Sequence, residues 1–195
     1  MVTASDKDGM DAIWLLDTNG FSHASLLIQD DEGNWWYYYW GSDSEYIIDV
    51  LKPYAIYGIT PWLSNTMRPG LNTNLKMYMR KTNLQINGFN TVSLKRINYL
   101  IPGLTQKGFS ESPHYDKAIY FRGDYTRSYH YAQYLFDNRK DLHYSVLHAN
   151  CAQTSIDILA MSQTNIFRRY TMFALANMLH PATIHELLSL FGENC

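Results

Sequence analysis

The residue best suited to covalent chemistry is Cys151, within the segment Tyr144-Ser-Val-Leu-His-Ala-Asn-Cys-Ala-Gln-Thr-Ser-Ile-Asp-Ile-Leu159. The apolar positions before Asn150 are typical of a short strand, and those after it recur at the period of one helix face. Cys151 is therefore predicted to lie in the first turn of a helix, with Asn150 as the N-cap. Unsatisfied backbone N–H groups and the positive end of the helix dipole favour the reactive thiolate there.

A cysteine nucleophile needs a base that lies near it in the fold, and the candidate base is His23. His23 lies near the start of a predicted strand over residues 21–28, on the face that also carries Ser25 and Leu27. A thiolate at a helix start that faces an imidazole on a strand is suited to acyl transfer. The competing interpretation is structural, because a free cysteine is usually a small buried apolar side chain and a strand histidine is often a satisfied core residue.

The expected neighbours of His23 come from the next strand, over residues 34–40, which is the most aromatic segment of the chain. A hairpin turn over residues 30–33 joins it to the histidine strand. With this four-residue turn, Trp40 lies opposite His23 and Tyr38 is the diagonal neighbour of His23 on the same face. The aromatic side chains could also line a groove for sugar rings or an acyl chain, or simply pack on both faces of a sheet.

No metal or cofactor site is predicted. His143 and His148 differ by five positions, so on a strand they would point to opposite faces and would not form a metal-binding pair. The other histidines show no spacing typical of zinc ligands, and no glycine-rich phosphate loop or paired-carboxylate motif occurs. Asp124 is predicted to be a helix N-cap. The scattered histidines are His114, His130, His180 and His185.

The predicted elements run from strands to helices, which indicates the α+β class, with an antiparallel sheet and flanking helices. Residues 60–90 are predicted to be an irregular insertion, with a short helix at 75–80, that could flank a site. Strands are predicted over 12–16, 21–28, 34–40, 45–51, 53–59, 91–101 and 115–121, and helices over 126–136, from 151 to 160, 166–179 and 183–191.

Length and composition predict a single domain over residues 1–195 with a frayed terminus over 1–10. The net charge of −2 gives no basic surface for nucleic acid. Neither a stretch of 18 apolar residues nor the layout of a secretory signal is present, so no membrane insertion is expected. The two cysteines do not indicate a disulfide framework. The expected location is the cytoplasm, or outside the cell by export without a cleaved signal peptide; an excised module of a longer protein is the other possibility.

The chain resembles the circularly permuted papain-like superfamily, which includes relatives of NlpC-type cell-wall peptidases and lecithin retinol acyltransferase-like enzymes. The resemblance lies in Ser22-His-Ala-Ser-Leu-Leu-Ile28 before an aromatic strand, and in Asn150-Cys-Ala on a later helix, in the same order. It covers roughly residues 12–41 and 115–162. It implies a permuted papain-like fold in which Cys151 matches the nucleophile and His23 the base. The third polar residue of the family has no clear match, because the predicted register offers Trp40 and Tyr38.

The expected function is therefore a thiol-dependent hydrolase, a papain-like cysteine peptidase or amidase, that acts without a cofactor on an amide bond. The expected substrate is a peptide or bacterial peptidoglycan. Two alternatives stay open. One is a catalytically inactive binding module of the same fold, which would hold a partner with the aromatic strand and residues 60–90. The other is an acyltransferase that forms a thioester on the cysteine.

Overall fold

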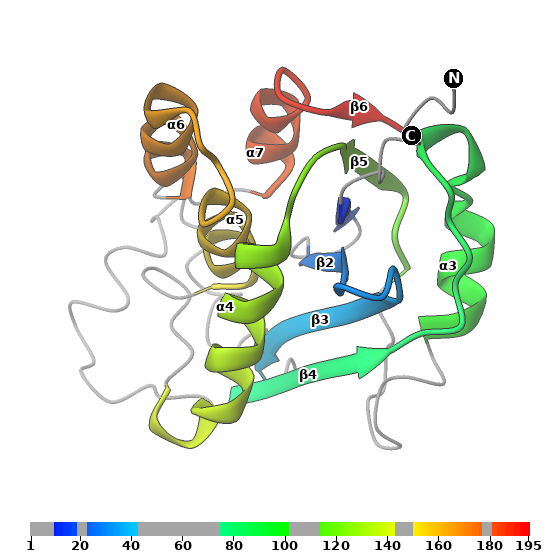
Figure 1. Cartoon of the computed structure of the whole chain (residues 1–195), viewed down its shortest axis with the longest axis horizontal. Coiled ribbons are helices and arrows are strands. Elements are labelled where there is room, and N and C mark those ends of the chain that lie inside the picture. The colour runs from blue at the N-terminus through cyan, green and yellow to red at the C-terminus, as the bar shows by residue number, and fades with distance from the viewer. Residues whose placement is uncertain (1–9, 19–22, 43–74, 102–113, 143–149, 177–180) are drawn as a thin grey trace, which may run out of the picture.

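The computed structural model describes residues 10–18, 23–42, 75–101, 114–142, 150–176 and 181–195. Within these ranges the chain forms a six-stranded sheet in the order β4-β3-β2-β1-β5-β6. All of the strand pairs are antiparallel. Helices cover the sheet, so the predicted α+β class is confirmed (Figure 1). The strands predicted over 45–51, 53–59 and directly before Asn150 lie outside the described residues.

The elements have the following bounds. The strands are β1 (Ala12–Asp17), β2 (His23–Gln29), β3 (Trp35–Ser42), β4 (Leu75–Lys81), β5 (Lys117–Phe121) and β6 (Glu193–Asn194). The helices are α3 (Leu94–Leu100), α4 (Thr126–Asp137), α5 (Cys151–Ala160), α6 (Ile166–Ala176) and α7 (Pro181–Leu188), with 3₁₀ turns η1 (Phe89–Thr91) and η3 (Arg139–Asp141).

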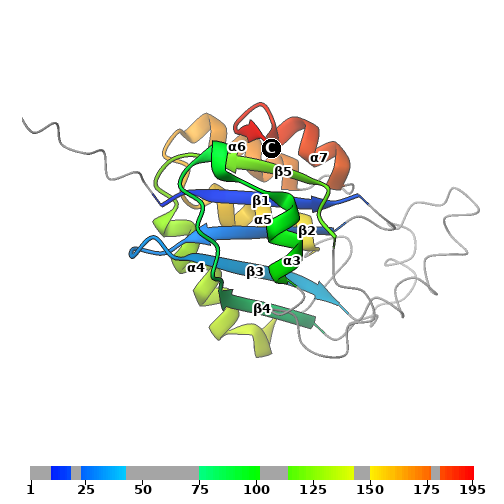
Figure 2. The ribbon, with the colours of Figure 1, turned by 90° about the vertical axis from the view of Figure 1, so that its right-hand side faces the viewer.

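The sheet is buried on both faces, which explains why β1 is an unbroken apolar run rather than an alternating one. On one face, hereafter the α5 face, Trp14 of β1 and Leu26 of β2 pack with α4, α5, α6 and α7. On the other, hereafter the α3 face, Leu15 and Leu27 pack with Ile97 of α3. Figure 2 looks onto the sheet and shows α3 in front of the strands with α4 and α5 behind them.

Two predicted elements are wrong. Residues 75–80, predicted as a helix, belong to strand β4, which pairs with β3 and places Met77 and Met79 on the α5 face. Residues 91–101, predicted as a strand, contain helix α3, because Ile97 and Ile101 are four positions apart and bury one side of a helix. Short apolar runs are ambiguous between the two structures, and here the tertiary contacts decide. Strand β6 has no counterpart among the predicted elements.

The predicted helices of the second half begin or end within a few residues of the observed ones. Asp124 precedes the N-cap position of α4, which is Tyr125, rather than occupying it. Its carboxylate still accepts the backbone N–H of Thr126 at 3.0 Å, so the predicted capping role is partly kept. Among the described residues, no helix combines the length and the apolar character needed to cross a membrane.

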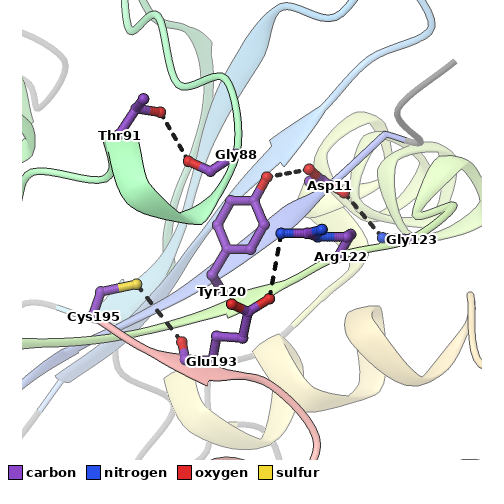
Figure 3. A network of polar contacts seen from close by, with 8 residues as sticks. All are labelled: Asp11, Gly88, Thr91, Tyr120, Arg122, Gly123, Glu193 and Cys195. Carbon is purple, nitrogen blue, oxygen red and sulfur yellow. Dashed lines mark hydrogen bonds and ion pairs between the residues drawn. The ribbon is translucent and has the colours of Figure 1, made fainter. Parts of the chain in front are cut away.

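A polar network ties the start of β1 to the end of β5 (Figure 3). The carboxylate of Asp11 accepts the hydroxyl of Tyr120 and, at 2.9 Å, the backbone N–H of Gly123. Arg122 and Glu193 form an ion pair at 3.6 Å that joins β6 to this region. Both side chains of the pair are well exposed, so the pair contributes at most about 1 kcal/mol. The network therefore joins β1 to β5 mainly through Asp11.

Candidate functional site

Cys151 is the first residue of α5, as its sequence context predicts. Asn150 adopts an extended backbone conformation, and its side-chain oxygen accepts the N–H of Gln153 at 2.8 Å. The hydroxyl of Ser155 donates to the carbonyl of Cys151 at 2.6 Å, within the same helix. Cys151 is buried, with 5% of its surface exposed. The nucleophile candidate thus lies in the first turn of a capped helix, whose dipole favours a thiolate, whereas its burial opposes one.

Replacement of Asn150 by alanine is expected to lower the free energy of unfolding by about 1 kcal/mol, because it removes the side chain that caps α5. The change should be visible in the midpoint of urea denaturation. Asn90→Ala is the matched control, since Asn90 is exposed in the η1 turn. Equal stabilities of the two variants would show that the cap does not hold the helix start that carries Cys151.

His23 is the first residue of β2, and its imidazole is engaged on the α3 face. Its Nε2 atom lies 3.1 Å from the hydroxyl oxygen of Ser25. Its ring stacks on Tyr39, with 4.5 Å between ring centroids. Burial lowers the pKa of His23 to about 4, and the opposing charge of Asp17 offsets only part of this effect. The imidazole is therefore neutral at physiological pH, and in this position it is a weak base.

A chain of buried hydroxyls leads to the imidazole of His23. Tyr115 donates its hydroxyl to Ser25 at 2.6 Å, and the hydroxyl of Tyr37 lies 2.7 Å from that of Tyr115. Because Ser25 accepts from Tyr115, its own hydrogen is available for Nε2 of His23, which then acts as the acceptor. In that arrangement the imidazole proton lies on Nδ1. Burial raises the pKa values of Tyr37 and Tyr115, so both phenols stay neutral.

The structure does not bring Cys151 and His23 together. Helix α5 packs against β2 on the face that carries Ala24, Leu26 and Ile28. Neighbouring residues of a strand point to opposite faces, so His23 and Ser25 belong to the other side. The contacts of the imidazole with Ser25 and Tyr39 agree with this placement. In this conformation the sheet lies between the predicted nucleophile and the predicted base.

The prediction that Tyr38 neighbours His23 is wrong, and the reason is the length of the hairpin turn. The turn has five residues instead of four, so Gln29 pairs with Trp35 and the register shifts by one. Asp30 sets this length, because its backbone N–H donates to the carbonyl of Asn34 at 2.9 Å and its carboxylate accepts the N–H of Asn34 at 2.8 Å. A shift of one residue moves every side chain of the strand to the other face.

As a result, each aromatic side chain of β3 lies on the face of the sheet opposite to the predicted one. Tyr39 takes the place beside His23, and Tyr38 lies on the α5 face. Trp35, Tyr37 and Tyr39 are buried on the α3 face. In the described part of the chain the aromatic strand is thus packed on both faces, as the packing alternative predicts.

His23 lies where the sheet is incompletely paired. The ladder between β2 and β3 ends at Leu26 and Tyr38. Strand β2 nevertheless pairs with β1 as far as His23 and Asp17, and β3 pairs with β4 as far as Ser42. At this end, no ladder of the described strands joins β2 to β3 beside His23. Fewer backbone hydrogen bonds hold the strand at His23 than in the middle of the sheet. Turning the side chain to the other face would therefore break fewer of them.

Asp17 is a site residue that the sequence interpretation missed. It lies directly across from His23 in the β1–β2 pair, and its charge favours the protonated imidazole. One of its carboxylate oxygens accepts the backbone N–H of His114 at 2.8 Å. The sequence places Asp17 in a turn cluster, and only the register of the first hairpin reveals that it faces His23.

The structure adds no metal centre. Among the described residues no group of three His, Cys, Asp or Glu side chains could hold a metal ion. His114 and His130 are exposed, and His185 is buried with its ring 5.9 Å from that of Trp14. His143, His148 and His180 lie outside the described residues.

The second cysteine, Cys195, provides an internal reference for thiol reactivity (Figure 3). It is exposed at the end of β6, and its Sγ lies 3.7 Å from the carbonyl oxygen of Glu193. Partial burial of the thiol raises the pKa of Cys195 to about 11. At pH 7.5 roughly one Cys195 thiol in three thousand would be ionised at that pKa. Cys195 is accessible but poorly activated.

The fold and the site define an antiparallel α+β protein with a buried cysteine at a capped helix start. No protein-family model, curated protein or solved structure matches the chain.

Proposed function

We propose that the chain is a thiol-dependent hydrolase of an amide bond in a peptide or in peptidoglycan, with Cys151 as nucleophile and His23 as base. The observation that carries the proposal is the position of Cys151 as the first residue of a capped helix. That helix packs against β2, the strand that begins at His23. A cysteine in this position has the electrostatic setting of a nucleophile, whereas a cysteine within the helix would not.

In the proposed reaction, His23 takes the proton of the Cys151 thiol and the sulfur attacks the carbonyl carbon of the amide. The backbone N–H of Cys151 donates to the oxygen that becomes negative, as helix-start N–H groups do in other acyl-transfer sites. The C–N bond then breaks, and the leaving amine takes the proton from His23. Water cleaves the resulting thioester, which releases the acid and restores the thiol.

The proposal requires the imidazole to leave its observed contacts. It must give up one hydrogen bond, to Ser25, and one ring stack, on Tyr39. Each of these interactions contributes about 0.5 to 1.5 kcal/mol. These two contacts alone cost about 1 to 3 kcal/mol, and turning the end of the strand to the other face adds to that cost. At most roughly 15% of molecules are therefore in the alternative state, which lowers the rate.

A catalytically inactive binding module of the same architecture is the second candidate. The observation that favours it is the position of the His23 imidazole on the face of the sheet opposite α5. If the imidazole never leaves that face, Cys151 has no base from this strand and its thiol serves only packing.

Alkylation with iodoacetamide separates the two candidates. For the enzyme we expect Cys151 to react faster than Cys195 near neutral pH, and His23→Ala to slow the labelling of Cys151 at least about tenfold. His130→Ala is the matched control, because His130 is exposed on α4. Mass spectrometry of the two cysteine-containing peptides gives both rates. Sluggish labelling of Cys151 that does not respond to His23→Ala would favour the inactive module.

A second test measures the reaction itself. Release of amino groups from peptidoglycan fragments or peptides should fall at least about a thousandfold in Cys151→Ser, because the hydroxyl is a far weaker nucleophile at neutral pH. Cys195→Ser should keep full activity, since Cys195 follows β6 and takes no part in the proposed step. Equal activity of the two variants would overturn the assignment of the nucleophile.

A further inference from the structure

A second cluster of polar side chains lies between β3, α4 and α5 and takes no part in the proposed hydrolysis. Within the part of the chain that the structure describes, the hydroxyl of Tyr38 and the side-chain oxygen of Gln153 are both buried without a hydrogen-bond partner. Tyr38 is 1% exposed. A buried polar atom left unpaired costs about 1 to 3 kcal/mol, and two in one region require an explanation.

Helix geometry and electrostatics connect these two groups to two others. Gln153 and Asp157 are four residues apart on α5, so they share one side of the helix. Tyr131 of α4 interacts electrostatically with Asp157 and also with Tyr38. Helices α4 and α5 pack side by side, and α5 also contacts β3 (Figure 1). We call Tyr38, Tyr131, Gln153 and Asp157 the α4–α5 site.

Among the described residues, no positively charged side chain acts on the α4–α5 site. Burial raises the pKa of Asp157 to about 6, and burial together with the charge of Asp157 raises that of Tyr131. Among the described residues, no hydrogen bond or ion pair of the Asp157 side chain offsets this burial. Tyr129, on the same helix, also has a raised pKa, from burial and from the carboxylates of the Asp30–Glu32 turn. The charges that act on these groups are all negative.

Aromatic surface adjoins this negative region. The rings of Tyr131 and Tyr134 stack on α4 with 6.4 Å between centroids, and Tyr134 is largely exposed. Tyrosine rings attract cations through their π faces. The region therefore combines a carboxylate, an amide oxygen and a phenol oxygen that can accept hydrogen bonds with rings that favour positive charge.

We propose that the α4–α5 site binds the primary ammonium group of an organic amine. An ammonium group has three N–H donors, which match the amide oxygen of Gln153, the carboxylate of Asp157 and the hydroxyl oxygen of Tyr38. An anion would meet the same negative charge and be repelled, and a neutral alcohol would supply only one donor. The proposal does not depend on Cys151 or His23, so a failure of the hydrolase proposal would not contradict it.

The test uses the full chain and three small probes of equal size: n-butylammonium, n-butanol and butyrate. At pH 7.5 we expect saturable NMR shifts of the Gln153 side-chain amide and the Tyr38 ring with n-butylammonium, with a dissociation constant in the millimolar range. Asp157→Asn should weaken this binding at least tenfold. Asp137→Asn, which removes an exposed carboxylate from the end of α4, should change it less than twofold.

Acidification gives a readout that needs no variant. Below the Asp157 pKa of about 6 the carboxylate takes a proton, so affinity for n-butylammonium should fall about tenfold per pH unit. Tyr38→Phe should weaken binding several-fold and keep the thermal midpoint near that of the wild type. Equal shifts with all three probes, equal effects of the two asparagine variants, or binding that does not change between pH 7 and 5 would each overturn the proposal.

Discussion

Replacement of Trp14 by alanine is expected to lower the free energy of unfolding by about 3 to 5 kcal/mol. Trp14 is fully buried on the α5 face of β1, where it pairs with Leu26 on one side and Ile119 on the other. Loss of the indole removes contacts between the middle of the sheet and the helices that cover it. Urea denaturation followed by far-UV circular dichroism measures the change.

Trp14→Phe should cost much less, about 1 to 2 kcal/mol. The indole N–H of Trp14 is buried without a partner among the described residues, so phenylalanine removes an unsatisfied donor along with part of the ring. Tyr99→Ala is the control for loss of an aromatic residue, because Tyr99 is 83% exposed on α3 and its removal should change stability by less than about 0.5 kcal/mol. Similar losses in Trp14→Ala and Tyr99→Ala would contradict the described core.

The parts of the fold that the sequence predicts are those set by local signals. The apolar run of β1, the hairpin around Gly33 and the helix start at Cys151 each depend on residues within a few positions of one another. Asn150 illustrates this well, because a cap needs only its own side chain and the N–H groups of the next turn. The nucleophile half of the candidate site was therefore predictable.

The partner of that nucleophile depends on register, which local patterns do not fix. The carboxylate of Asp30 closes a five-residue turn, and the extra residue exchanges Tyr38 for Tyr39 beside His23. Which face His23 occupies is decided by its alternation with Ala24, which packs under α5. Asp17 becomes a neighbour of His23 only through the pairing of β1 with β2. The contacts of Ala24 and Asp17 join separate segments of the chain, so the sequence of one segment alone does not predict them.

The acid sensitivity of the fold is expected to fall when His23 is replaced by glutamine. The folded pKa of His23, about 4, lies below its ordinary value of 6.5. The unfolded chain therefore takes up the proton first as the pH falls. Stability from this residue is fully present above pH 6.5 and is lost between pH 6.5 and 4. We expect the wild type to lose about 2 kcal/mol more than His23→Gln over that range, a figure reduced for partial exposure of the ring.

The comparison between variants is needed because protonation of Asp157 changes the stability in the opposite direction to protonation of His23. Its folded pKa, about 6, is raised from 3.8, so acidification through that range favours the folded state and masks part of the loss from His23. Subtracting the pH profile of His23→Gln from that of the wild type cancels the Asp157 contribution. His130→Gln, an exposed change on α4, should reproduce the wild-type profile. If His23→Gln also reproduced it, the imidazole would be solvated rather than buried.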